Sequence, residues 1–254
     1  GNYNTVVGDE AGTAISTGGT NSFFGYSAGD ATTTGNSNTA VGRLSLSTNT
    51  TGSNNTALGT NTLYLATTAT YNTAIGGSAG AAITTGFDNT LIGGLAGDAL
   101  TDADYNTAIG KEALTSDTLG SRNTAVGWSA LANQNFTSAT NSYNTAMGFQ
   151  AGLSVSTGVK NTLIGALAGD ALTDADFNVA VGTSSLAIDT LGSKSVAIGY
   201  DTLQAQNFTS ATDSFNTAVG FQAGYAVTTG LKNTLIGGLA GDALTDADLN
   251  VAIG

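Results

Sequence analysis

The sequence predicts an all-β fold, a repetitive parallel β-solenoid of 15 coils that are mostly 17 residues long. Three observations support this prediction. A block Asn-Thr-apolar-apolar-Gly recurs along the whole chain, Gly makes up 36 of the 254 residues, and Pro is absent. This Gly share is roughly twice that of an ordinary domain. Thr, Asn and Gly are poor helix formers and the apolar residues lack a helical period, so we expect strands joined by many regular turns.

The spacing of the block glycines defines the coils. Of the fourteen spacings, twelve are 17 residues and two are 21. The glycines are Gly8, Gly25, Gly42, Gly59, Gly76, Gly93, Gly110, Gly127, Gly148, Gly165, Gly182, Gly199, Gly220, Gly237 and Gly254. The fourth residue after each glycine alternates as two Gly and then two Leu, which gives a larger unit of four coils. We therefore expect one solenoid domain over 1–254, with sub-units 1–42, 43–110, 111–182 and 183–254.

Four residues of each block form rows when coils stack, which we call the asparagine, threonine, middle and aliphatic rows in chain order. Stacked amides of the asparagine row can bond from coil to coil, so Asn38, Asn55, Asn72 and Asn106 should form a ladder. The middle row is Ala in ten of the fifteen coils, and the aliphatic row is bulky throughout.

Side chains alternate between the two faces of a strand. We therefore expect the bulky aliphatic row to fill the coil interior and the small middle row to lie outside. The aliphatic row includes Ile75, Ile109, Ile164 and Ile236. After the block glycine we expect a short second strand, then a turn.

Composition narrows the function. The net charge is −12, and Cys and His are absent. An acidic surface repels nucleic acid and anionic lipid, and no apolar run nears the length of a membrane helix. The absence of Cys and His removes the usual nucleophile, general base and metal ligand, so we expect no enzyme and no cofactor except Ca²⁺. The chain begins with Gly1 rather than Met, and we expect a processed chain or a fragment.

The blocks Ser195-Val196-Ala197-Ile198-Gly199 and Asn250-Val251-Ala252-Ile253-Gly254, with the many Asn-Thr-Ala-Ile/Val-Gly copies, resemble a known family. They are similar to the head repeats of YadA-like trimeric autotransporter adhesins, and equally to the repeat shafts of phage-type tail-fibre proteins. The resemblance implies a left-handed parallel β-roll and three chains side by side. It also implies an extracellular, cell-surface or virion fibre that grips a glycan or protein receptor. The adhesin heads repeat at a shorter period, so one turn must be longer here.

The strand faces agree with self-association. No charged residue occurs in any of the fifteen blocks. A long uncharged outer stripe usually meets a partner, and parallel copies of the same chain are the simplest partner. We expect a homotrimer joined along the small middle row, with no nucleic-acid partner and no membrane insertion.

Two groups of residues are candidate binding sites. A repeated Gly-Asp-Ala-Leu-Thr-Asp-Ala-Asp turn places three carboxylates within seven residues, which suits Ca²⁺ or else a solvated turn. These residues are Asp98, Asp102 and Asp104, Asp170, Asp174 and Asp176, and Asp242, Asp246 and Asp248. The two four-residue insertions both contain Asn-Phe-Thr-Ser-Ala-Thr. Phe136 and Phe208 in them either stack on sugar rings or fold back over the coil.

The threonine row raises ice binding as an alternative of another class. A flat ice-binding face would need two parallel threonine rows, and strand alternation places only one on each face. The alternative to a fibre is therefore a Thr-rich ice-binding or glycan-binding solenoid.

Overall fold

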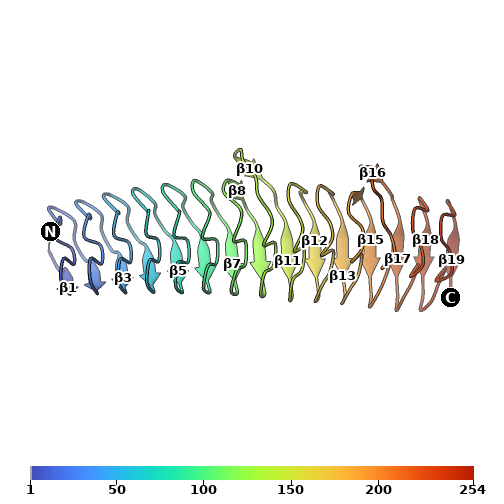
Figure 1. Ribbon diagram of the computed structural model, residues 1–254, viewed down its shortest axis with the longest axis horizontal. Helices are drawn as coiled ribbons and strands as arrows, with labels where there is room; N and C mark the ends of the chain where they lie inside the picture. Colours follow the sequence, from blue (N-terminus) through green and yellow to red (C-terminus); the bar gives the residue numbers. More distant parts are fainter. Residues whose placement is uncertain (1) are drawn as a thin grey trace. The chain divides into compact units, whose positions relative to one another are not determined.

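The computed structural model describes residues 2–254 and shows a parallel β-solenoid with fifteen block strands and no helix among them. The chain divides into two compact units. Unit 1 comprises the residues up to Asn123 together with Asn135–Asn141, and unit 2 comprises Thr124–Gln134 and Ser142–Gly254. Within each unit, each coil places one short strand beside the strands of the neighbouring coils (Figure 1).

Each block forms one three-residue strand, because the following glycine ends the extended conformation. In unit 1 these strands are β1 (Thr5–Val7), β2 (Ser22–Phe24), β3 (Thr39–Val41), β4 (Thr56–Leu58), β5 (Thr73–Ile75), β6 (Thr90–Ile92) and β7 (Thr107–Ile109). In unit 2 they are β9 (Thr124–Val126), β11 (Thr145–Met147), β12 (Thr162–Ile164), β13 (Val179–Val181), β15 (Val196–Ile198), β17 (Thr217–Val219), β18 (Thr234–Ile236) and β19 (Val251–Ile253). Neighbours pair in parallel and in register, as Thr39 with Thr56 and Val41 with Leu58.

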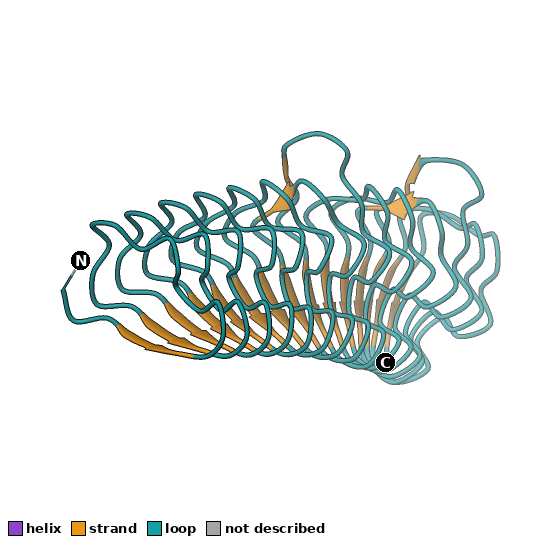
Figure 2. Cartoon of the chain, turned by 60° about the vertical axis from the view of Figure 1, so that its left-hand side comes forward, coloured by secondary structure: helices purple, strands orange, loops and turns teal. Residues whose placement is uncertain are grey.

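The second strand predicted after the glycine is absent from these coils. The second and fourth residues after the block glycine both have positive φ, as at Asn61 (φ 55) and Leu63 (φ 48) after Gly59. Alternate left-handed residues curl the backbone, so this segment is a series of turns. Figure 2 shows the block strands along one side of the coils and turns on the other sides.

The insertions add two short strand pairs. In unit 1, β8 (Gly120–Ser121) pairs with β10 (Thr140–Asn141), and in unit 2, β14 (Gly192–Ser193) pairs with β16 (Thr212–Asp213). The loops that end in β10 and β16 project beyond the neighbouring turns (Figure 2).

The prediction that the aliphatic row fills the interior is wrong. The middle row is buried, whereas Ile109, Ile164 and Ile236 are 36%, 37% and 40% exposed. Ile75 is half-buried. The asparagine and middle rows are two residues apart, so alternation sends both to the same side of the strand. Because the asparagine amides bond inside the coil, the middle row lies inside and the aliphatic row outside.

The four-coil period reflects volume compensation in this narrow core. Where the middle row is small, as at Ala57, the buried Leu63 fills the interior. Where the middle row is Leu91, the matching residue is Gly97, and a Cβ there would lie 2.8 Å from a methyl carbon of Leu91. Where both positions are small, as at Ala74 and Gly80, Leu63 and Leu91 of the neighbouring coils fill the space, because interiors are close-packed.

The asparagine row forms the predicted ladder. Asn55 N donates to Asn38 Oδ1 at 3.0 Å, and Asn72 N donates to Asn55 Oδ1 at 3.0 Å. The side-chain amide of Asn55 donates to Ala69 O at 2.7 Å. Asn106 repeats this pattern, with its backbone N donating to the amide oxygen of the preceding coil. The ladder satisfies backbone groups that flank the strand and would otherwise be buried without partners.

Candidate functional site

The outer face of the block strands carries no charged residue in either unit. It carries the threonine row and the aliphatic row side by side, because both point away from the buried middle row. In β12, Thr162 is half-buried, Leu163 is fully buried and Ile164 is exposed. The face is regular because each strand pairs in register with its neighbours.

Two corners flank this face. We call the residue before each block asparagine the leading corner, and the residue after each block glycine the trailing corner. Among the exposed large hydrophobic side chains of the described residues, all but four lie on the outer face, on these corners or on the residue that follows the trailing corner. The exceptions are Val6, Leu65, Ile188 and Tyr225. We call the outer face with its two corners the apolar band.

The remaining sides of the coil carry threonine hydroxyls that bond to the neighbouring coil. Thr50 Oγ1 donates to Thr67 O at 3.1 Å, and Thr84 Oγ1 donates to Thr101 O at 3.2 Å. These hydroxyls link one coil to the next and so stabilise the stack. These hydroxyls already have hydrogen-bond partners within the chain, whereas the exposed side chains of the apolar band are not covered by it.

The leading corner alternates aromatic and cationic residues over much of the chain. In unit 1, the guanidinium carbon of Arg122 lies 4.6 Å from the ring centroid of Tyr105, and its Nε donates to Asn141 Oδ1 at 3.0 Å. In unit 2, Lys160 Nζ lies 4.8 Å from the ring centroid of Phe177. A cation over an aromatic face is attracted by about 0.5–1 kcal/mol at an exposed site, so these contacts hold the corner side chains in place.

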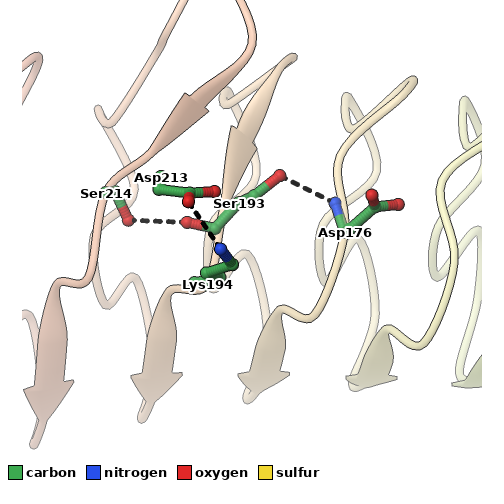
Figure 3. Close-up of polar contacts among 5 residues, drawn as sticks. All are labelled: Asp176, Ser193, Lys194, Asp213 and Ser214. Carbon is green, nitrogen blue, oxygen red and sulfur yellow. Dashed lines mark hydrogen bonds and ion pairs between the residues drawn. The ribbon is translucent and has the colours of Figure 1, made fainter.

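The insertion in unit 2 fastens one of these cations. Lys194 Nζ lies 2.5 Å from Asp213 Oδ2 (Figure 3). It also lies 5.2 Å from the ring centroid of Phe215. Ser214 Oγ donates to Ser193 O, which ties β16 to β14, and Asp176 N donates to Ser193 Oγ (Figure 3). The insertion therefore fixes the position of Lys194 at the edge of the apolar band.

The repeated carboxylates do not gather around one point. Among residues 2–254 no group of three His, Cys, Asp or Glu side chains could hold a metal ion. Asp98 accepts from Thr115 Oγ1, Asp102 from Thr85 Oγ1 and Asp104 from Phe87 N. The copies Asp174, Asp176 and Asp248 accept in the same way from Thr157, Val159 and Leu231, and Asp246 accepts from its neighbour Thr245. All of these bonds except that of Asp246 tie neighbouring coils together, and the geometry lends the calcium hypothesis no support.

Burial perturbs some of these carboxyls. Loss of hydration raises the pKa of Asp104 and Asp170 above 3.8, and the same cause raises the pKa of Asp30. In Asp104 the hydrogen bond from the backbone of Phe87 opposes this effect. Asp170 Oδ1 is buried without a hydrogen-bond partner, and Asp242 occupies the equivalent place four coils later.

Of the two alternatives for Phe136 and Phe208, the structure shows the rings folded back over the coil rather than open to sugar rings. Both are only 6% exposed, because each ring folds back over its coil. A Cβ on Gly192 would lie 2.7 Å from a ring carbon of Phe208, which shows how closely the ring packs there. The exposed residues of the loops are the small polar ones at their tips.

Asp117 and Asp189 are both fully buried, although an Asp side chain is rarely buried unless it is paired. Asp189 Oδ1 accepts from Gly192 N and Phe208 N, and its Oδ2 accepts from Gln206 Nε2 at 2.6 Å. Asp117 likewise accepts from Gly120 N and Phe136 N. The sequence holds a signal for this role, since the same position is Ile83 and Leu100 in the two coils before Asp117, and each Asp stands in the coil just before an insertion. The carboxylate supplies the acceptor for the backbone where the loop leaves the coil.

The one Ser in the asparagine row belongs to the same network. Ser195 N still donates to Asn178 Oδ1, and its hydroxyl lies 2.6 Å from Ser214 Oγ. Asn216 N then donates to Ser214 Oγ at 3.4 Å, so the insertion replaces the missing rung of the ladder.

Neither an enclosed site nor a membrane span is evident in the part of the chain that the structure describes. No pocket is found there. It also contains no helix able to cross a lipid bilayer. The apolar band is therefore the main candidate for function in residues 2–254.

Comparison of the chain with protein-family models, with curated proteins and with solved structures finds no match.

Proposed function

We propose that the chain is a segment of an extracellular fibre, cell-surface or viral, in which parallel copies associate through the apolar band as a homotrimer. The observation that supports the proposal is the exposed aliphatic row beside an uncharged threonine row on a chain of net charge −12. Such a fibre projects a binding tip or presents repeated weak contacts to a glycan or protein receptor. Its role is mechanical and requires no catalytic residue.

The energetics favour a partner for this face. Fully burying a Leu, Ile or Val side chain contributes about 1.5–3 kcal/mol. Ile164 and Ile236 remain more than a third exposed, so covering each would add roughly 0.5–1 kcal/mol. The gain repeats at every coil, and a row of such residues outweighs the entropic cost of association.

A copy of the same chain fits the face better than an unrelated surface. The aliphatic row repeats once per coil, and coils rise by about 4.8 Å, the spacing of paired strands. A second solenoid has the same rise, so every coil meets an equivalent coil. The acidic residues lie outside the blocks and keep assembled fibres apart in solution.

The test is the molar mass of the chain and of two matched variants by light scattering after size-exclusion chromatography. Ile164→Asp places a charge on the outer face, and Ser210→Asp places the same charge at the exposed tip of an insertion loop. We expect three times the chain mass of 25.0 kDa for the unmodified protein and for Ser210→Asp. Ile164→Asp should shift the mass toward that of one chain. A single-chain mass for the unmodified protein would refute the proposal.

The outer face of unit 1 supports one second candidate. Its seven strands all begin with a hydroxyl residue, Thr or Ser, beside an aliphatic or Phe residue in the aliphatic row. A flat, regular hydroxyl row of this kind is the feature that suggested ice binding. Thermal hysteresis of the single chain would support this candidate, and its absence would remove it.

A further inference from the structure

Stacked aromatic pairs stand on the trailing corner of unit 2. Tyr200 and Phe221 have ring centroids 5.5 Å apart and an interplanar angle of 10°. Trp128 and Phe149 form a second pair at 5.1 Å and 28°. All four residues lie at the edge of the apolar band and are 40–55% exposed. Large aromatic surfaces left open in this way are typical of protein contacts.

The leading corner carries matching residues at the same coils. Lys194 and Phe215 occupy the leading corner in the coils whose trailing corners are Tyr200 and Phe221. Lys194 is fixed by Asp213 (Figure 3) and by the ring of Phe215. In unit 1 the order is reversed in one coil, where Tyr105 leads and the exposed Lys111 trails.

These matched residues cannot meet within one chain. Lys194 and Tyr200 are separated by six residue steps that include β15, so the strand holds them roughly 20 Å apart. In a parallel assembly about an axis along the solenoid, the leading corner of one copy faces the trailing corner of the next. An antiparallel pair would instead bring like corners together.

We propose that neighbouring copies associate in parallel and in register, with the leading corner of one chain against the trailing corner of the next. Lys194 then lies on Tyr200 of the next copy, Phe215 packs against Phe221, and Tyr105 meets Lys111. Cations on aromatic faces and paired aromatic rings are both favourable contacts. The inference rests on the proposed function, and it specifies the direction and register of the assembly.

Disulfide cross-linking tests the arrangement, because the chain has no Cys of its own. The double variant Phe215→Cys/Phe221→Cys places one thiol on each corner of one coil. Two residues with Cα atoms more than about 7 Å apart cannot form a disulfide, so the pair cannot close within one chain. We expect oxidation to give a covalent species of three chains, whereas each single-Cys variant stays uncross-linked.

A register control uses Phe215→Cys with Thr183→Cys, whose trailing corner lies two coils earlier, about 10 Å along the axis. It should not cross-link. Covalent dimers from a single-Cys variant would show that like corners meet, and efficient cross-linking of the register control would show a shifted register. Either result would overturn the inference.

The molar mass under reducing conditions separates the two proposals. A single-chain mass for the unmodified protein refutes the proposed function itself. An assembled, reduced double variant that fails to cross-link refutes only the corner arrangement. If Phe215→Cys/Phe221→Cys no longer assembles, the double variant Tyr105→Cys/Lys111→Cys in unit 1 replaces it. Cross-linked trimers of this variant would support the corner arrangement, and an assembled variant that fails to cross-link would refute it.

Discussion

Two adjacent glycines in unit 1 provide a sharp test of how the coils stack. Gly76, a block glycine, has φ +131, and a Cβ there would lie 2.5 Å from Gly93 O in the next coil. A Cβ on Gly77 would meet nothing within 4 Å. Gly76→Ala therefore combines a strained backbone of about 1–3 kcal/mol with a steric clash of similar size, roughly 2–6 kcal/mol in total.

Gly77→Ala is the matched control. It adds the same methyl group one residue away, and we expect its free energy of unfolding to stay within about 1 kcal/mol of the unmodified value. Chemical denaturation followed by circular dichroism measures both variants. Equal stability of the two variants would refute this account of Gly76, because only Gly76→Ala combines a left-handed backbone with a contact to the next coil.

Three further predictions concern single side chains. Asn55→Ala removes one rung of the ladder and leaves Asn72 N without its acceptor, so we expect a loss of roughly 2–4 kcal/mol by denaturation, and an unchanged midpoint would contradict the ladder. Leu163→Asp should unfold its coils, whereas Ile164→Asp should keep the circular dichroism spectrum of the unmodified chain, and the reverse order would show that the faces are exchanged. Burial raises the pKa of Asp170 above 3.8, so the folded chain binds more protons than the unfolded chain just above that value, and stability falls as pH rises through the folded pKa. Asp170→Asn should raise stability at neutral pH and flatten this dependence, and an unchanged pH profile of unfolding would contradict it.

The coil length, the position of each strand and the asparagine ladder could be predicted from sequence, because all three follow from a strict repeat. Residue size could not predict which face of the strand points into the coil. Both faces of the strand are uncharged, and the rule that large residues lie inside placed Ile164 wrongly. The asparagine ladder predicts the correct direction. An asparagine whose amide bonds inside the coil points inward, and the residue two positions later lies on the same face of the strand and therefore also points inward.

The contacts of the candidate site residues could not be predicted for a related reason. Stacking places each carboxylate beside the coil before or after it, so Asp102 bonds to Thr85 rather than to its neighbours in sequence. Phe136 lies close to its own coil because the buried Asp117 anchors its backbone. Spacing along the chain therefore does not show which residues meet, and the coil register does.

The single Trp gives the most direct test that the apolar band is covered by another copy. Trp128 lies on the trailing corner and is 40% exposed in one chain. We predict that its fluorescence is shielded from acrylamide quenching at concentrations where the chain assembles, and that dilution or Ile164→Asp restores quenching. A Trp that is freely quenched in the assembled protein would show that the copies meet elsewhere, and would contradict the account.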